Sequence, residues 1–349
     1  MKVSVIRPHE LGPRERMRWR ALQLANPGLA SPYFSWQFAQ AAAAARTDVR
    51  VAVLEEDHRV VGFFPFQQRM GAGLPAGGRL SDHHGVIAAP GTQWDWAELL
   101  MGCRLSYWQF DHLAAWQRPP VPVSCGSSPG LDLSRGYDAW LRGRLDGSSS
   151  LASLPRKARK LAREVGPLRF ELLSRDAAAF DEVIRLKSEQ CRRTGQLDFF
   201  AWDWTRALVQ RLRDIDDEDF GGCLSTLHAG DTLVAAHFGI HTPQVLHWWF
   251  PVYSQAHSPF SPGSLLLLEV AREAARSGHG LLDLGKGDER YKQSFADCSW
   301  PLLEGFIARR TPVTFARDLK KRLGAWVRTS PLAAPARPLL RHWSSRTPS

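Results

Sequence analysis

The chain has 349 residues, of which 44% are hydrophobic and 23% are charged, and its formal net charge is +10. These fractions are those of an ordinary globular protein, and no stretch approaches about 20 consecutive apolar residues, which excludes a membrane-spanning helix. Because the length exceeds what one hydrophobic core usually holds, the sequence favours two domains.

The positive charge is concentrated at the C-terminal end. Residues 316–349 contain eight Lys or Arg and a single acid, Asp318. Such a tail suits an anionic partner, for example a membrane surface, nucleic acid or an acidic polymer, but a solvated chain end explains it equally well. The N-terminal sequence lacks the apolar core of a signal peptide. We therefore expect a cytoplasmic protein that makes at most a peripheral contact with the inner membrane.

The cysteines and histidines give no metal site. The five cysteines are scattered without the spacing of a zinc or redox pair, so we expect free thiols. Asp82, His83 and His84 stand together, but no third well-spaced ligand is evident. We predict no bound metal and no permanently bound cofactor.

The first part of the chain has a mixed pattern. Apolar periodicity predicts a strand over 2–6, a helix over 34–46 and two strands within 49–69. The stretch GAGLPAGG is typical of a loop, residues 94–110 have mixed character, and RPPVPVSCGSSPG is typical of a connection. A basic helix follows over 151–165, where LPRK predicts a start because Pro is tolerated in a first turn.

The second part predicts strands and helices in an order that leads to the candidate site. In chain order they are a strand over 168–173, helices over 177–193 and 202–215, a meander of three strands (CLSTLHA, TLVAAHFGIH and VLHWWFPVY), a helix over 264–278, the short strand LLDL and a last strand over 302–310. We predict a domain over 1–150, a second over 151–315 and the tail over 316–349.

The sequence SPFSPGSLLLL predicts a helix start after an aromatic strand. Ser261, Gly263 and Ser264 lie where free N–H groups and the helix dipole favour a phosphate group. Ordinary capping explains the same residues, so both interpretations stay open.

Two histidines occupy apolar strands. His237 shares a face with the small residue Gly239, and His247 shares a face with Trp249. Such histidines are more often hydrogen-bonded core residues than catalysts, but the small residues also leave space for a ligand.

The stretch LLDLGKGDERYKQSF ends a short apolar strand at two glycines. It is not a phosphate-binding P-loop, and it lacks the third glycine of a dinucleotide fingerprint. The spacing predicts Asp288 as a helix N-cap, with Glu289, Tyr291 and Lys292 in the first turn. Tyr can donate a proton and the acids can accept one, although a capped turn explains the pattern alone.

The order of these elements is similar to that of the GNAT acyl-CoA transferase fold. Four sequence motifs resemble the CelD/BcsL-type acetyltransferases, which are related to Fem aminoacyltransferases and often linked to bacterial polysaccharides. These motifs are AAHFGI, LHWWFPVY, SPFSPGSLLL and DLGKGDERYKQSF. SPYFSWQFAQ, VVGFFPFQQR and SDHHGVIA resemble the first, degenerate domain of that group, and LPRKARKLAREVGPLRFELL resembles the join. The resemblance implies an α/β fold of tandem GNAT-like domains, each a mixed twisted sheet flanked by helices.

The resemblance also implies a donor and its site. Acetyl-CoA would be a co-substrate whose pyrophosphate lies against the N–H groups from Ser261 to Leu265, although only Gly263 stands for the usual glycines of that loop. Tyr291 would be the general acid, and Asp288, Glu289 or His237 would be the base. The residues expected to bind the substrate are Lys292, His247 and Trp249.

The implied function is transfer of an acyl group to an amine or hydroxyl of a sugar or lipid-linked saccharide precursor. An alternative is aminoacyl transfer to a peptidoglycan precursor, but the region between Leu186 and Cys223 has no room for the coiled-coil insertion of Fem enzymes that use tRNA. A non-catalytic binding module of polysaccharide machinery is the alternative from another class, and we expect no nucleic-acid partner.

Overall fold

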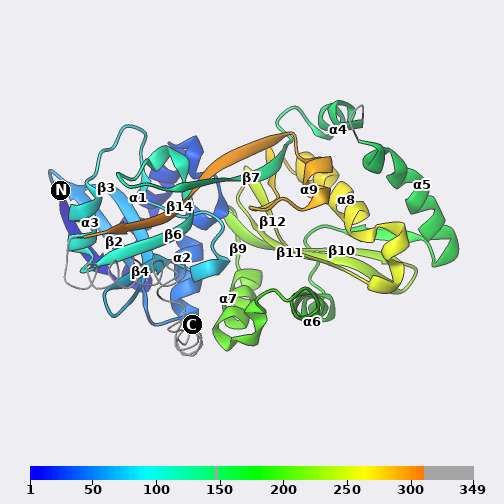
Figure 1. Cartoon of the computed structure of the whole chain (residues 1–349), viewed down its shortest axis with the longest axis horizontal. Helices are drawn as coiled ribbons and strands as arrows, with labels where there is room; N and C mark the ends of the chain where they lie inside the picture. Colours follow the sequence, from blue (N-terminus) through cyan, green and yellow to red (C-terminus); the bar gives the residue numbers. More distant parts are fainter. Residues whose placement is uncertain (146–147, 310–349) are drawn as a thin grey trace, which may run out of the picture.

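The structure is a computed structural model that describes residues 1–145 and 148–309. The predicted basic tail at 316–349 lies outside the described residues. Figure 1 shows two halves side by side, the first at the left and the second at the right, with long strands running between them.

One mixed sheet of 14 strands runs through the described part of the chain. Its main path is β1-β2-β3-β4-β6-β14-β7-β13-β12-β11-β10-β8, with β5 beside β3 and β9 beside β10. The strands of the first half are β1 (Lys2–Ile6), β2 (Val49–Glu56), β3 (Arg59–Arg69), β4 (Ala72–Pro75), β5 (Ile87–Ala88), β6 (Tyr107–Ala114) and β7 (Ser124–Asp132). Those of the second half are β8 (Leu168–Glu171), β9 (Asp216–Asp217), β10 (Phe220–Ala229), β11 (Thr232–His241), β12 (Val245–Tyr253), β13 (Leu281–Asp283) and β14 (Cys298–Ala308).

Helices flank this sheet. They are α1 (Pro13–Leu24), α2 (Trp36–Ala45), α3 (Trp96–Gly102), α4 (Tyr137–Leu145), α5 (Ser149–Glu164), α6 (Ala177–Thr194), α7 (Asp203–Asp214), α8 (Pro262–Arg276) and α9 (Arg290–Phe295). Short 3-10 helices are η1 (Pro8–Glu10), η2 (Pro27–Leu29), η3 (Pro32–Phe34), η4 (Gly78–Leu80), η5 (Ala115–Gln117), η6 (Phe199–Ala201) and η7 (Gln255–Phe260). Most predicted helices and the strand meander are confirmed.

The amphipathic pattern explains how α5 and α8 pack. In α5, Leu151, Leu154 and Leu161 are buried while the basic residues face outward. In α8, Leu266 and Val270 are fully buried against the strand meander. These apolar stripes recur at helical spacing, and their burial holds both helices on the sheet.

The last strand ties the halves together. β14 pairs antiparallel with β6 on one side and with β7 on the other, and β7 pairs with β13. In Figure 1, β7 and β14 run across the middle of the molecule. The apolar core is also shared, since Tyr33 and Phe38 of the first half pack with Val209 and Phe238 of the second. The predicted domain boundaries stay a prediction.

Two stretches predicted as loops are strands. Ser124–Asp132 is β7, at the centre of the sheet, and Ala72–Pro75 is β4. In β7 a Cβ added at Gly130 would lie 3.1 Å from the Leu282 carbonyl oxygen, so a small residue permits the close approach of β13. The Gly, Ser and Pro composition therefore reflects tight packing, where sequence pattern indicates a turn.

The predicted start of α5 is wrong. The helix begins at Ser149, where Ser148 caps it by accepting a hydrogen bond from the Leu151 N–H at 3.4 Å, and Pro155 lies inside the helix. Pro155 lacks an N–H group, so it removes one helix hydrogen bond in the second turn.

Candidate active site

Two parallel strands part at the centre of the second half. β12 pairs with β13 only over three residues, and the last pair is His247 with Asp283. β12 continues from Trp248 to Tyr253 beyond that pair, and in the described sheet no strand covers this edge. The N–H and C=O groups of such an edge can bind an extended ligand.

A bulge in β12 lies at the same point. The register between β11 and β12 shifts between Phe238 and Ile240, whose partners are Phe250 and His247. A Cβ added at Gly239 would lie 2.0 Å from the carbonyl oxygen of His247, so only glycine fits. The backbone of β12 therefore fills the space that the sequence predicted for a ligand beside Gly239.

His237 supports this bulge. Its Nε2 accepts a hydrogen bond from the backbone N–H of Trp249 at 3.2 Å, and its ring stacks on Trp248 with centroids 4.1 Å apart. The side chain is fully buried, and burial lowers its pKa to about 3. His237 is thus a neutral ring whose acceptor lone pair is already in use.

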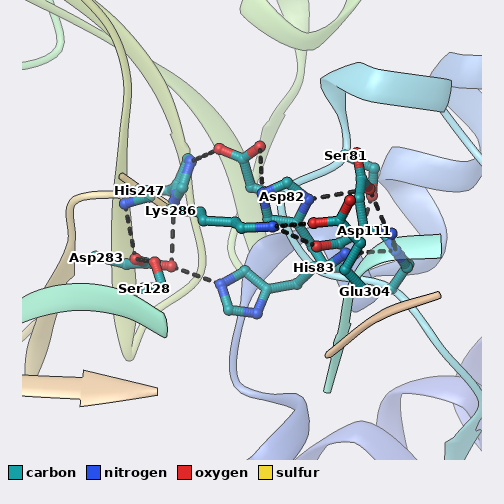
Figure 2. A network of polar contacts seen from close by, with 12 residues as sticks. Ser81, Asp82, His83, Asp111, Ser128, His247, Asp283, Lys286 and Glu304 are labelled. Atoms are coloured by element: carbon teal, nitrogen blue, oxygen red, sulfur yellow. Dashed lines mark hydrogen bonds and ion pairs between the residues drawn. The ribbon is translucent and has the colours of Figure 1, made fainter. Parts of the chain in front are cut away.

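His247 lies between two carboxylates from different halves. Its Nε2 is 3.0 Å from Oδ2 of Asp82, which precedes the first-half strands β5 and β6. Its Nδ1 is 3.2 Å from Oδ2 of Asp283, the last residue of β13. Figure 2 shows Asp82 and His247 facing one another, with Asp283 beyond the ring. The ring therefore bridges the two halves.

The charges of this group stabilise each other. Burial lowers the pKa of His247, but the carboxylates of Asp283 and Asp82 outweigh burial and raise that pKa to about 9. Burial also opposes the charge of Asp283, yet His247 and His83 hold its pKa well below the usual range. For Asp82, His247 likewise outweighs burial and lowers the pKa. At neutral pH the group is an imidazolium between two carboxylates.

Asp283 is fully engaged by its surroundings. His83 Nε2 lies 2.8 Å from Oδ2, the Ser128 hydroxyl lies 2.5 Å from Oδ1, and the Gly285 N–H donates to Oδ1 at 3.0 Å. Its side chain is 3% exposed, whereas that of Asp82 is 21% exposed. Asp82 is therefore the carboxylate of this group that a substrate can reach.

The solvent-facing rim around Asp82 carries two exposed acids, each paired with a base. Asp111 is 38% exposed and lies 3.0 Å from Nδ1 of His112, and Glu304 is 56% exposed. Lys286 bonds to Glu304 at 3.0 Å and to the Asp111 carbonyl at 3.1 Å. Figure 2 shows Lys286 reaching across this rim.

Tyr33, in η3, packs against His247 from the first half. The two rings meet edge to face with centroids 5.0 Å apart, and the Tyr33 side chain is 3% exposed. Its hydroxyl has no hydrogen-bond partner among the described residues. Burial and then the charges of Asp82 and Asp283 raise its pKa well above 10, so it remains a proton donor.

The start of α8 is a separate, basic region. Ser261 has a left-handed backbone with φ of 55°, and its carbonyl accepts hydrogen bonds from the N–H groups of Ser264 and Leu265 at 3.0 and 3.1 Å. Lys157 of α5 donates to the Ser261 hydroxyl at 2.7 Å. Three of the N–H groups predicted to hold phosphate, those of Ser261, Ser264 and Leu265, therefore already bond to backbone carbonyls, and Pro262 has no N–H. Lys157 adds a positive charge that the sequence did not place there.

Nearby residues reinforce the basic character of the α8 start. The ammonium of Lys160 lies 5.5 Å from the centroid of the Phe260 ring. A Cβ added at Gly263 would lie 3.3 Å from the Tyr253 ring, so the helix start packs closely on the free end of β12. The α8 start and the unpaired β12 edge are thus adjacent.

The predicted N-cap of α9 is wrong. The cap is Glu289, with no side-chain hydrogen bond, and Asp288 lies in the loop as an exposed residue. Glu289 instead pairs with Lys292 at 2.9 Å. Lys292 is 4% exposed and also donates to the carbonyls of Gly285 and Lys286 at 3.0 and 3.1 Å. All three ammonium donors of Lys292 therefore hold the loop after β13.

Tyr291 and Trp249 lie in apolar surroundings. Tyr291 packs against the core that contains Trp248, and burial and the Glu289 charge raise its pKa. Trp249 is 9% exposed, stacks on Phe250 at 4.4 Å and meets Tyr33 edge to face at 5.5 Å. The predicted residues thus fall into three groups, at α8, at α9 and on β11–β12.

The sequence patterns did not identify every residue of the site. Asp283, Ser128 and Tyr33 were not singled out, and Asp82 and His83 were considered only as metal ligands. The described residues hold no group of three or more His, Cys, Asp or Glu side chains arranged to bind a metal. An acid that ends a buried strand and has a glycine two residues later, as in LLDLG, is the signal that could have indicated Asp283.

Two cavities lie elsewhere. One of about 340 Å³ is lined by Arg175, Arg213 and His241, and another of about 270 Å³ by Arg20, Trp36 and Asp219. Neither includes the His247 group or the α8 start. The helices in the described ranges also include none with the length and apolar composition that a bilayer crossing requires.

Comparison with known protein families identifies the second half. Residues 148–293 match the family model described as "Acetyltransferase (GNAT) domain". This stretch is similar to a GNAT acetyltransferase domain. The domain begins at α5 and ends within α9, so it contains the unpaired β12 edge and the α8 start.

Solved structures share the fold at low identity. FemX is 10% identical over 90% of this chain and 99% of that chain, with a TM-score of 0.55. The C-terminal domain of a protein assigned as a lysylphosphatidylglycerol synthetase, from Agrobacterium fabrum, is 12% identical over 88% and 94%, with a TM-score of 0.54. A Bacteroides thetaiotaomicron protein of unknown function is 10% identical over 84% and 97%, with a TM-score of 0.52. No curated protein matches the sequence.

These findings confirm the predicted GNAT-like α/β fold, and they indicate an acyltransferase. GNAT domains generally use acyl-CoA as a co-substrate.

Proposed function

We propose that the chain transfers an acyl group, acetyl in the first instance, from acyl-CoA to an amine or hydroxyl of a saccharide or lipid-linked saccharide precursor. The single observation that carries the donor is the parting of β12 and β13 after His247 and Asp283, next to the α8 start. The CelD/BcsL resemblance supports the acceptor class and a role in exopolysaccharide or cell-envelope synthesis.

The donor fits this edge by its chemistry. The pantetheine arm of CoA is extended and carries amides, which match backbone groups on the β12 edge that β13 leaves uncovered. The Trp249 N–H, which bonds to His237, and Pro251, which has no N–H, are not among the free donors. Its pyrophosphate is anionic, and the α8 start offers the helix dipole, the hydroxyls of Ser261 and Ser264, and the ammonium of Lys157. The thioester then lies where the strands part, close to His247.

The positioning of the thioester beside the acceptor supplies most of the rate acceleration. Holding a thioester and a nucleophile together removes most of the entropic barrier, and no covalent intermediate on the protein is needed. As its carbon–sulfur bond breaks, the thiolate needs a proton, and Tyr291 on α9 remains our proposal for the donor because its pKa is raised.

The second candidate is aminoacyl transfer to a peptidoglycan precursor. The shared fold with FemX favours it. Against it, the region between α6 and β10 holds η6, α7 and the two-residue strand β9, and α7 spans only 12 residues, so this region carries no coiled-coil insertion. We therefore place acyl-CoA first.

Calorimetric titration with acetyl-CoA tests the donor assignment. We expect saturable binding by the wild type, and about tenfold weaker binding by Lys157→Gln because one charged contact to phosphate is lost. Lys2→Gln, at an exposed lysine paired with Glu55 in β2, is the matched control. Wild-type protein that fails to bind acetyl-CoA but accepts aminoacyl-tRNA would favour the second candidate.

A further inference from the structure

The acceptor side of the site is the least assigned part of the molecule. The family match covers residues 148–293, yet the buried group around His247 draws residues from outside that range. Asp82 bonds to His247, and Tyr33 packs on its ring. The first half therefore contributes side chains to the point where β12 and β13 part.

We propose that the first half supplies acceptor-side residues of the active site, with Asp82 as the base and Tyr33 as the residue that orients the nucleophile. This proposal rests on the acyltransferase function proposed above. It adds to that function two residues that lie outside the matched domain.

Geometry favours Asp82 over the other carboxylates. Asp283 is 3% exposed and is held by His83, Ser128 and the Gly285 amide, so it has no free position for a substrate. Asp82 is 21% exposed and uses Oδ2 for His247, which leaves Oδ1 toward the rim, where the nearest base is His112 at 3.9 Å. A substrate nitrogen or oxygen can bond to that atom.

The unpartnered hydroxyl of Tyr33 is an independent sign of a ligand position. A buried hydroxyl without a hydrogen bond costs free energy, so a partner is expected when the site is filled. The hydroxyl is near enough to Asp82 and Asp283 for their charges to raise its pKa. An acceptor N–H or O–H placed between Tyr33 and Asp82 would satisfy both groups.

In the proposed reaction a proton moves from the acceptor to Asp82, and the acyl group moves from sulfur to the acceptor. A neutral acceptor amine, formed when the ammonium loses a proton to solvent, or an acceptor hydroxyl attacks the thioester carbon. The remaining N–H or O–H bond becomes far more acidic as positive charge develops on the attacking atom. Asp82 takes that proton, the carbon–sulfur bond breaks, and its electron pair leaves with sulfur as thiolate. Asp82 then passes the proton to solvent through its exposed edge, while Tyr291 gives its proton to the thiolate to form CoA and regains one from solvent. A carboxylate suffices because the proton leaves after attack has begun.

His247 positions this base. The imidazolium donates to Asp82 from Nε2 and lies 3.2 Å from Asp283 through Nδ1. It fixes the Asp82 side chain and keeps it ionised. The carboxylate of Glu304, which is 56% exposed on the rim, favours acceptors that carry a positive charge, such as an amino sugar.

The test uses the full chain, acetyl-CoA and glucosamine as the probe, with N-acetylglucosamine as the uncharged counterpart. Product formation is measured by mass spectrometry. We expect Asp82→Asn to lower turnover by at least about 100-fold, as for loss of a general base, and Tyr33→Phe to raise the KM for glucosamine with a smaller loss in kcat. Acetyl-CoA affinity should be unchanged in both.

Asp111→Asn is the control, because Asp111 lies on the same rim without contacting His247. It should keep turnover within about threefold of the wild type, since surface charges contribute little. Turnover by Asp82→Asn equal to that of Asp111→Asn, with acetyl-CoA binding intact, overturns the proposal while leaving the acyltransferase function in place. Absent acetyl-CoA binding by the wild type contradicts the function itself.

A second measurement applies if the wild-type protein binds acetyl-CoA but acetylates neither glucosamine nor N-acetylglucosamine. The ring resonances of His247 are followed by NMR at saturating acetyl-CoA while glucosamine is added. We expect them to shift in the wild type and in Asp111→Asn but not in Asp82→Asn. Unperturbed His247 resonances in the wild type contradict an acceptor position beside Asp82.

Discussion

The start of α8 and the group around His247 are opposite kinds of binding region. The α8 start is basic and partly open, and its residues are neighbours in the sequence except for Lys157 and Lys160, which come from α5. The His247 group is acidic at its rim, buried at its centre, and assembled from residues about 165 positions apart, as with Asp82 and His247. The difference teaches that the donor side of this site is local in sequence, while the acceptor side depends on the two halves packing together.

Of the substitutions that distinguish the two regions, the removal of His247 should have the largest effect on stability. His247→Ala leaves Asp82 and Asp283 without their shared cation, and Asp283 stays buried. Loss of one partner of a buried ion pair costs about 3–5 kcal/mol, so we expect a fall of that size in the free energy of unfolding. Urea denaturation followed by tryptophan fluorescence measures it. The exposed His9→Ala should change stability by less than about 0.5 kcal/mol, and an equal loss in both variants would contradict a buried ionic junction.

Alkaline pH should weaken the same junction. The titratable groups that face His247 are Asp82, Asp283, Tyr33, His83 and His237. The pKa of His247 is raised to about 9, so its contribution to stability is complete below the unfolded value of about 6.5 and is lost as pH rises through about 9. The pKa of Asp82 and of Asp283 is lowered, so their contribution is present above about 4 and is lost as pH falls below that value.

Denaturation midpoints measured from pH 5 to pH 10 test this. Wild-type stability should fall between pH 7 and pH 9.5 by more than that of His247→Gln, which lacks the titrating ring. Parallel curves for the two proteins would show that His247 is not the group that titrates.

The fold was largely predictable from the sequence, and the acceptor side was not. Helical periodicity places α6, α7 and α8 within a few residues, because local apolar spacing decides which face is buried. β7 was missed because its Gly, Ser and Pro residues pack closely between β13 and β14, a tertiary constraint that turn statistics cannot represent. Asp283 gains its partners His83 and Ser128 only when the sheet is complete, so the local pattern LLDLG can mark its position but not its role.

Substitution of Tyr291 on α9 should have a moderate effect on turnover. This effect distinguishes the donor side of the site from the ionic group around His247. Tyr291→Phe removes the hydroxyl proposed to protonate the thiolate, so we expect about a tenfold lower kcat with unchanged acetyl-CoA affinity. Pre-steady-state measurement of CoA release checks this. Tyr107→Phe, in β6 of the first half, is the matched control. If Tyr291→Phe matches that control, the thiolate takes its proton from another source.

The smallest effect should come from the rim. Glu304 is 56% exposed and pairs with Lys286, so Glu304→Gln should change the free energy of unfolding by less than about 1 kcal/mol. If the acidic rim attracts a cationic acceptor, the same variant should raise the KM for glucosamine slightly, and less so at high salt. A KM that stays constant at low and high salt would remove the rim from acceptor recognition.

Hydrogen–deuterium exchange with and without acetyl-CoA tests the central claim most directly. The claim is that the donor binds along β12 beyond His247 and ends at the α8 start. We predict slower exchange on binding in peptides that cover residues 248–265, with little change in α1, α3 or the other peripheral elements of the first half. Saturated acetyl-CoA binding with unchanged exchange over residues 248–265 would contradict the account.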